Sequence, residues 1–197
     1  MFLATGWAMH QSTNTLTRTN VDTIITEYSR SIKNLGRSIA NLHGIRLFEA
    51  LKRKVVGAGP YPGVTLFEAA NRIMSDLVIL HGVNWLLNQN VFPFDSYTVE
   101  YGNEDKNGFD ICARARGKTL IGEAFNVAPS FFQIKKSAML KKLRVATADF
   151  KIIMVNHDAA PATYGPRLQD KEFFVVVNIS TGAARVVPST WAGKAAK

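Results

Sequence analysis

Several features that define common protein classes are missing or scarce in this chain of 197 residues. It has one cysteine, Cys112, which cannot close an internal disulfide, and the spacing of its four histidines is not that of a zinc site. No stretch reaches the roughly 20 apolar residues needed to cross a bilayer. The first residues have no basic segment ahead of an apolar run, so we expect no cleaved secretory signal, no membrane partner and a cytoplasmic location.

Two common catalytic motifs are also missing. The glycine-rich stretch GAGPYPG at 57–63 contains two prolines and is not followed by the Gly-Lys-Ser/Thr of a phosphate-binding loop. No G-x-S-x-G sequence is present, so the chain has no nucleophile elbow of the α/β-hydrolase type. The sequence therefore indicates neither a P-loop nucleotide site nor a serine hydrolase.

Acidic side chains are outnumbered by basic ones, 15 to 24, which gives a formal net charge of +9. Residues 1–60 carry 8 basic and 3 acidic groups, residues 61–110 carry 2 and 7, and residues 111–197 carry 14 and 5. Basic surfaces attract polyanions, of which DNA and RNA are the commonest in a cell. This pattern favours a nucleic-acid partner, with a merely well-solvated basic surface as the alternative.

The first part of the chain, up to residue 88, shows mainly helical patterns. Residues 1–19 show no pattern and are expected to form an arm or a loosely docked segment, whereas apolar residues at three- and four-residue steps predict a helix over 21–42. A second helix is expected at about 44–55, with its apolar residues Ile45, Leu47, Phe48 and Leu51 facing inward. Thr65 and Glu68 have the spacing of a capping box, which predicts a largely buried helix over 65–88.

From residue 96 the pattern becomes extended. Short β-rich runs at 96–102, 108–115 and 118–127, separated by hairpin-length turns, predict three antiparallel strands. A helix opened by Pro129 follows, and continuous apolar runs at 150–158 and 172–180 suit strands buried on both faces. We therefore expect an α/β protein, with residues 1–60 forming an N-terminal arm and helical extension and residues 61–197 forming an α/β core.

Two carboxylates lie where charge is normally excluded, because Asp110 and Glu123 each interrupt an apolar strand. Alternation places Glu123 on the same strand face as Ile121 and Phe125. An ionised carboxylate held there needs a cation, a hydrogen-bonding network or a raised pKa. In a tight hairpin both acids would reach one divalent ion, and Mg²⁺ commonly uses one or two carboxylates together with water and a substrate phosphate.

Simpler interpretations exist for both acids. Asp110 would also suit the closing position of a turn, and Glu123 would suit a buried ion pair with Lys118 or Arg114. Glu68, likewise, fits equally well as the capping partner of Thr65 and as a support for a metal site.

The order of elements, with Glu68 in TLFEAANR, Asp110 in NGFDICA, Glu123 in TLIGEAFNV and the basic helix FFQIKKSAMLKK, resembles the PD-(D/E)XK nuclease superfamily over about residues 64–180. The resemblance implies a restriction-endonuclease-like αβββαβ core, a central mixed sheet flanked by helices. It also implies that Asp110 and Glu123 bind Mg²⁺ or Mn²⁺ with support from Glu68.

One position departs from the family pattern, because Phe125 stands where the motif lysine is expected. Some members supply this lysine from the next helix, which makes Lys136 or Lys135 the candidates here, with Gln133 beside them. The resemblance thus implies a metal-dependent endonuclease that hydrolyses DNA. A type II restriction-like enzyme that acts as a homodimer is one form that it allows. Expected nucleic-acid contacts are the basic residues of the helical segments: Arg30, Lys33, Arg37, Lys52, Arg53, Lys54, Lys141, Lys142 and Arg144.

Two other functions remain compatible with these residues. A catalytically inactive nucleic-acid-binding protein would keep the same fold and basic surface without the lysine. A structural or partner-binding protein with a basic surface would have weak DNA affinity that does not depend on Asp110 or Glu123.

Overall fold

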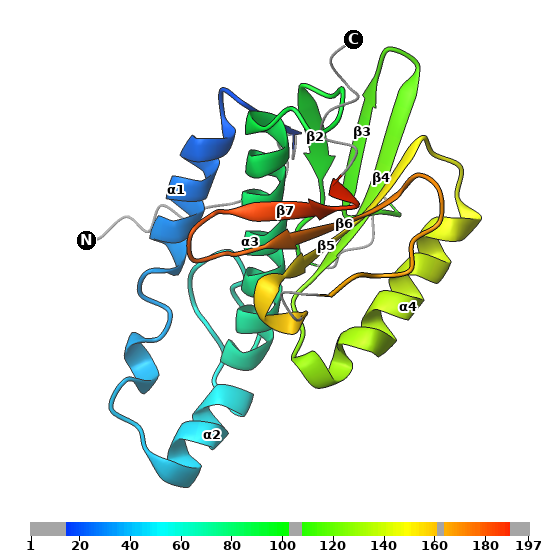
Figure 1. Ribbon diagram of the computed structural model, residues 1–197. Coiled ribbons are helices and arrows are strands. Elements are labelled where there is room, and N and C mark those ends of the chain that lie inside the picture. The colour runs from blue at the N-terminus through cyan, green and yellow to red at the C-terminus, as the bar shows by residue number, and fades with distance from the viewer. Residues whose placement is uncertain (1–14, 103–107, 161–163, 190–197) are drawn as a thin grey trace.

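A computed structural model describes residues 15–102, 108–160 and 164–189. Within these ranges the chain has mixed α/β structure built on one seven-stranded sheet (Figure 1). The strands are β1 (Thr15–Thr17), β2 (Ser96–Val99), β3 (Ile111–Ala115), β4 (Lys118–Phe125), β5 (Phe150–Asn156), β6 (Glu172–Val177) and β7 (Ala184–Val187). The α-helices are α1 (Val21–Ile32), α2 (Gly44–Arg53), α3 (Leu66–Asn88) and α4 (Pro129–Val145), and short 3₁₀ turns cover Arg37–Ile39 and His157–Ala159.

The strands lie in the sheet in the order in which they occur in the chain, from β1 to β7. Strands β1 to β4 pair antiparallel, β4, β5 and β6 pair parallel, and β7 returns antiparallel to β6. A parallel connection needs a crossover, and α4 supplies it between β4 and β5. The antiparallel strands expected at 96–102, 108–115 and 118–127 are therefore confirmed, with slightly shorter bounds.

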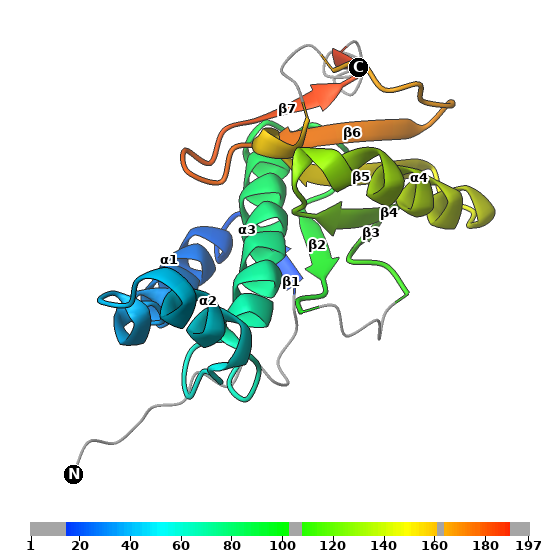
Figure 2. The same ribbon diagram turned by 90° about the horizontal axis from the view of Figure 1, so that it is seen from below.

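The sheet has one long helix on each face (Figure 2). On one face Leu120 and Ala124 of β4 belong to the same core as Val83 and Leu87 of α3. On the other face Phe125 packs into a separate core with residues of α4 that include Phe132, Leu140 and Leu143. This arrangement follows from the alternation of side chains along a strand, because successive residues of β4 serve the two helix layers in turn.

Helix α3 begins where its capping box predicts. The side chain of Thr65 accepts a hydrogen bond from the backbone N–H of Glu68 at 3.2 Å, and the helix then runs to Asn88 with eleven buried residues. Strands β5 and β6 are buried along almost their whole length, as their continuous apolar runs predict. No helix in the described part of the chain is long and apolar enough to cross a membrane.

The N-terminal region differs from its expected form. The helix predicted over 21–42 ends at Ile32, where Asn34 and Gly36 follow with low helix propensity. Residues 15–17, expected as part of an arm, form the edge strand β1, in which Leu16 is buried. A strand this short has too few residues to show an alternating pattern, and β7 was missed for the same reason.

Helix α2 forms as predicted, but only part of its apolar face points inward: Leu51 packs against the core, whereas Ile45 and Phe48 do not. Ile45 is 78% exposed and Phe48 is 67% exposed, and α2 contains no buried residue. The amphipathic pattern correctly indicates a helix with one apolar face. It does not say whether another part of the same chain covers that face.

Candidate functional site

The pairing of β3 with β4 brings the two strand acids together. Ile111 pairs with Gly122 and Cys112 with Ile121, so Asp110 and Glu123 stand opposite each other one step beyond the last paired residues. Side chains in this relation point to the same face of a sheet, with their Cβ atoms about 5 Å apart. That face is the one covered by α4, since Ile121 and Phe125 belong to the core that includes Phe132.

Asp110 is held in place by the neighbouring strand. Its Oδ2 accepts a hydrogen bond from the backbone N–H of Ala124 at 2.8 Å, and Oδ1 accepts none from the described residues. Burial raises the pKa of Asp110 above its ordinary value, and the hydrogen bond from Ala124 opposes that rise. One carboxylate oxygen is therefore fixed, which leaves the other available to a ligand.

A third acid continues the row. The backbone N–H of Glu100, which directly follows β2, donates to the carbonyl oxygen of Asp110 at 2.9 Å. Glu100 is buried, and its charge contributes to the raised pKa of Asp110. We call Glu100, Asp110 and Glu123 the carboxylate row. Sequence reasoning missed Glu100, although alternation with Val99 already puts it on the opposite face from the α3 core.

Glu123 is almost fully buried, with 3% of its surface exposed. The ammonium nitrogen of Lys142, on α4, lies 2.8 Å from its Oε1. Burial raises the pKa of Glu123 to about 7, with Lys142 opposing the rise and the charge of Asp110 adding to it. The buried ion pair considered for Glu123 does exist, but its partner is Lys142. Lys118 instead pairs with Asp149 at 2.9 Å.

The lysines of α4 differ in whether they face the carboxylate row. Lys135 is exposed, and its charge lowers the pKa of both Asp110 and Glu123, so it lies on the side of α4 that faces the carboxylate row. Lys136 instead donates to Gln133 Oε1 at 2.7 Å and to the Tyr164 hydroxyl at 2.6 Å. The lysine in contact with Glu123 is thus neither of the two favoured candidates but Lys142, expected only as a nucleic-acid contact.

The helical acid expected to support the site, Glu68, is half-exposed and forms an ion pair with Arg72 at 2.6 Å. Two turns further along α3, Asp76 is buried and accepts hydrogen bonds from Tyr28 at 2.6 Å, from Tyr61, and from the N–H of Gly102 at 3.1 Å.

Burial raises the pKa of Asp76 to about 6, although its three hydrogen bonds oppose the rise. The charge of Asp110 adds to the rise, so Asp76 is an α3 acid close enough to the carboxylate row to interact with it electrostatically. Sequence reasoning missed Asp76. The available signal was an acid in the middle of an otherwise apolar helix.

The basic residues expected to contact nucleic acid lie in different settings. Arg144 forms a two-pronged ion pair with the buried Glu172, at 2.6 and 2.8 Å. Lys52 lies over the ring of Phe67, and Arg53 pairs loosely with Glu49. Besides Lys52, the expected residues whose side chains are exposed and make no ion pair within the described ranges are Arg30, Lys33, Arg37, Lys54 and Lys141.

The donor set of the row suits a hard divalent cation in part. Across residues 15–102, 108–160 and 164–189, no three His, Cys, Asp or Glu side chains gather closely enough to hold an ion by themselves. Two neighbouring carboxylates nevertheless match the usual protein contribution to a Mg²⁺ site, in which water and substrate phosphate complete the shell. A cation between Asp110 and Glu123 would also relieve the like-charge repulsion that raises the pKa of Glu123.

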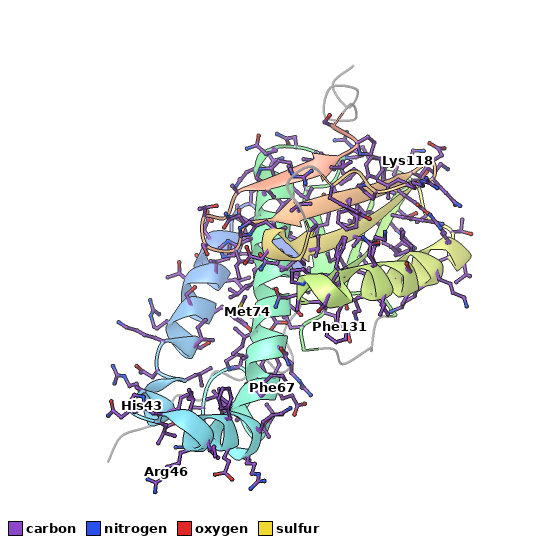
Figure 3. All side chains as sticks on the ribbon, turned by 60° about the horizontal axis from the view of Figure 1, so that its bottom comes forward. His43, Arg46, Phe67, Met74, Lys118 and Phe131 are labelled. Atoms are coloured by element: carbon purple, nitrogen blue, oxygen red, sulfur yellow. The ribbon has the colours of Figure 1, made fainter. Side chains whose placement is uncertain are left out.

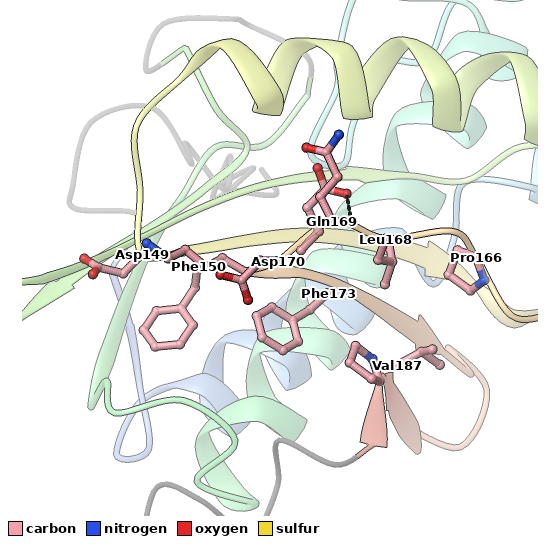
Figure 4. Close-up of a pocket in the computed structure, with 11 residues that line it drawn as sticks. Asp149, Phe150, Pro166, Leu168, Gln169, Asp170, Phe173 and Val187 are labelled. Carbon is pink, nitrogen blue, oxygen red and sulfur yellow. Dashed lines mark hydrogen bonds between the residues drawn. The ribbon is translucent and has the colours of Figure 1, made fainter.

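A pocket of about 480 Å³ lies at the start of β5 and β6 and the end of β7 (Figure 4). Phe150, Phe173 and Val187 form its apolar wall, and Phe150 opens β5 opposite Leu120, three residues before Glu123 on β4. Two of its three acids, Asp149 and Glu172, are engaged by Lys118 and Arg144. No residue of the carboxylate row lines the pocket.

Comparisons of the chain with protein-family models and with curated proteins give no match. The arguments for a function consequently depend on the geometry of the carboxylate row and the basic residues around it.

Proposed function

We propose that this chain is a metal-dependent endonuclease that hydrolyses DNA phosphodiester bonds. The observation that carries the proposal is the position of Asp110 and Glu123, side by side on one face of adjacent strands. Buried neighbouring carboxylates destabilise a fold unless a cation or protonation offsets the repulsion between their charges. A divalent ion bound by both is the simplest function that accounts for them.

The arrangement of elements supports a restriction-endonuclease-like core. Helix α3, strands β2 to β4, helix α4 and strand β5 follow each other in the order αβββαβ, with three antiparallel strands and then a parallel one. A helix covers each face of this part of the sheet. In such a core Asp110 and Glu123 occupy the second and third strands, as the resemblance implies.

In this proposal Asp110 and Glu123 hold Mg²⁺ or Mn²⁺, which when bound would activate water and neutralise charge on the phosphodiester. Asp110 is preset for this role because Ala124 fixes one of its oxygens. Glu123 ligates in its ionised form, which burial and Asp110 disfavour below about pH 7. Asp76, which interacts electrostatically with Asp110, positions the chain after β2 through its hydrogen bond from Gly102.

Lys142 takes the part of the missing motif lysine. Phe125 is buried against Phe132 of α4 and offers no cation. The ammonium of Lys142 lies at Glu123 and is about one third exposed, so it can meet both the carboxylate and a phosphate approaching from solvent. Its positive charge would orient the attacking water or stabilise the extra negative charge on phosphorus.

The exposed cations would bind the rest of the substrate. Lys135 faces the row from α4, Lys141 is exposed on the same helix, and Arg30, Lys33 and Lys54 add exposed cations in the N-terminal region. Such contacts position a nucleic acid without reading its sequence. Cleavage of both strands would follow if two copies combine, because one catalytic site cuts one strand and a two-fold axis relates the strands of a palindrome.

A second candidate function is a nucleic-acid-binding protein without activity. The ion pair between Lys142 and Glu123 favours it, since the lysine already neutralises the carboxylate without a metal. In that protein Lys142 would be a permanent structural partner of Glu123. In the enzyme it would yield when a divalent ion binds.

Plasmid cleavage separates the two candidates. Supercoiled DNA is incubated with the protein and Mg²⁺, Mn²⁺ or EDTA, using wild type, Asp110→Asn, Glu123→Gln and the matched exposed control Glu68→Gln. The proposal expects metal-dependent nicking that both row variants lose and the control keeps. Salt-sensitive binding without nicking in either metal would establish the inactive binder instead.

A further inference from the structure

Four large apolar side chains lie exposed around helix α2 and the start of α3. Their exposed fractions are 78% for Ile45, 67% for Phe48, 57% for Val55 and 46% for Phe67. Ile45 and Phe48 are three residues apart, so they share one side of α2, and Val55 joins the start of α3 through its bridge to Thr65. We call these four residues, together with Lys52, the aromatic surface.

Lys52 connects the two halves of this surface. It follows Phe48 by one helical turn, and its ammonium nitrogen lies 4.3 Å from the centre of the Phe67 ring. A cation over a ring is favourable, but at an exposed site it contributes little to stability. The contact therefore shows that Phe48, Lys52 and Phe67 are neighbours, rather than explaining why two phenylalanines face solvent.

The surroundings of the aromatic surface are basic. Arg46, Arg53 and Lys54 are exposed on or directly after α2, whose only acid, Glu49, lies 3.7 Å from Arg53. Phe67 is next to Glu68, and that acid is engaged by Arg72. Each nearby acid thus has its own cation, and the remaining positive charge is left to an anionic ligand.

We infer that the aromatic surface binds an unpaired strand of nucleic acid, with bases stacked on Phe48 and Phe67 and phosphates bound by Arg46, Lys52 and Lys54. Exposed rings alternating with cations are what single-stranded nucleic acid requires, because every base has a flat face and every linkage carries a charge. In duplex DNA the faces of the bases are covered by their neighbours, so rings at the surface gain nothing from them. An unpaired strand accounts for both the aromatic rings and the charges.

The same helix connects this surface with the carboxylate row. Phe67 lies near the start of α3, and Asp76, whose pKa is raised in part by the charge of Asp110, lies nine residues later, about 14 Å along the axis. In Figure 3, Arg46 marks α2, Phe67 marks the start of α3 and Phe131 marks the first turn of α4. All three lie in the part of the view away from Lys118, which begins β4. The proposed substrate is therefore DNA with a single-stranded segment beside the cleavage site. This choice of substrate rests on the proposed nuclease function. The binding of an unpaired strand to the aromatic surface does not depend on that function.

Fluorescence anisotropy tests the inference without cleavage. The full-length protein is titrated in EDTA against labelled oligothymidylate and against a duplex of the same length, as wild type and as Phe48→Ala/Phe67→Ala. We expect tighter binding of the single strand by the wild type, and a loss of about 5- to 100-fold in the variant. Duplex affinity should change less than about twofold, because it depends on the cations alone.

The matched control is Phe131→Ala/Val145→Ala, which removes two exposed apolar side chains from α4 (62% and 84% exposed) and should leave oligothymidylate affinity unchanged. Thermal unfolding of all three proteins checks that each remains folded. Equal binding of oligothymidylate by the wild type and the α2–α3 variant would overturn the inference. So would binding of an acidic amphipathic peptide in place of the oligonucleotide. Absence of Mg²⁺-dependent nicking with intact strand binding would refute the nuclease alone.

Discussion

The ammonium nitrogen of Lys142 lies 2.8 Å from Oε1 of Glu123, so a partly exposed cation of the helix layer contacts an almost fully buried carboxylate of the sheet. This pair lies next to Asp110, whose charge raises the pKa of Glu123 while Lys142 lowers it. One lysine therefore balances repulsion within the row. The proposed catalytic role of Lys142 can be measured directly.

Replacing Lys142 tests that role. Lys142→Met keeps the length of the side chain and removes its charge, so the pKa of Glu123 should rise above its value of about 7. Nicking should fall by at least about 100-fold, as is usual when a charge-stabilising donor is lost. NMR titration of the Glu123 carboxyl measures the first effect, and a plasmid assay measures the second.

Lys136→Met is the control, because its ammonium bonds to Gln133 and Tyr164. It should leave both the titration and the nicking rate unchanged. A Lys142→Met protein that nicks at the wild-type rate would remove Lys142 from the proposed mechanism.

The pH dependence of stability should reveal Glu123. Its ordinary pKa is 4.5 and its folded value is about 7, so the folded chain holds this proton more tightly than the unfolded chain. The stability supplied by the protonated form is fully present below pH 4.5 and is lost as pH rises through about 7. Glu123→Gln should thus be more stable than wild type by on the order of 2 kcal/mol near pH 8, with little difference near pH 4.

Urea unfolding in EDTA at both pH values provides the measurement. A difference between the two proteins that is the same at each pH would mean that Glu123 does not titrate in this range. With Mg²⁺ present the wild type should recover stability, because a bound cation favours the ionised carboxylate.

Asp76 should be a major structural contact. Asp76→Ala leaves the buried hydroxyls of Tyr28 and Tyr61 and the N–H of Gly102 without their acceptor, which should cost about 3 kcal/mol or more. Glu68→Ala, on the same helix, removes only an exposed ion pair and should cost less than about 1 kcal/mol. Chemical denaturation of both variants gives the comparison, and equal losses would contradict it.

Replacing Arg144 should mainly lower the stability of the fold, whereas replacing Lys141 should mainly weaken DNA binding. Arg144→Ala strands the buried carboxylate of Glu172 and should lower the unfolding free energy by about 3 kcal/mol. Lys141→Ala changes an exposed cation, so it should leave the melting temperature unchanged while weakening DNA binding and reducing its salt dependence. Calorimetry and anisotropy over a range of salt concentrations measure the two effects. A stable Arg144→Ala protein with weakened DNA binding would reverse this assignment.

The sequence carries enough local information to predict most elements and the shared face of the two strand acids. The capping box at Thr65 and Glu68 is complete within four residues, and strand alternation with a short turn specifies that Asp110 and Glu123 lie on one side. Both features depend on neighbours in the chain. They could therefore be deduced before the tertiary structure was known.

Contacts between layers could not be deduced in the same way. Lys135, Lys136 and Lys142 look alike in sequence, and only the rotation of α4 on the sheet decides which of them meets Glu123. Asp76 finds its partners on α1 and in the loop before α3, far away in the chain. The exposed side of α2 was expected to be covered, because an apolar helical face does not reveal whether its partner belongs to the same molecule.

Gly122, which pairs with Ile111 beside the carboxylate row, occupies a position where a larger side chain does not fit. A Cβ atom at residue 122 would lie 2.4 Å from Cγ1 of Ile152 and 3.3 Å from Cβ of Ile111. Even alanine would therefore push β4 away from a neighbouring strand and change the separation of the acids on the reverse side. Random mutagenesis scored on activity should leave this position invariant, although no chemistry takes place there.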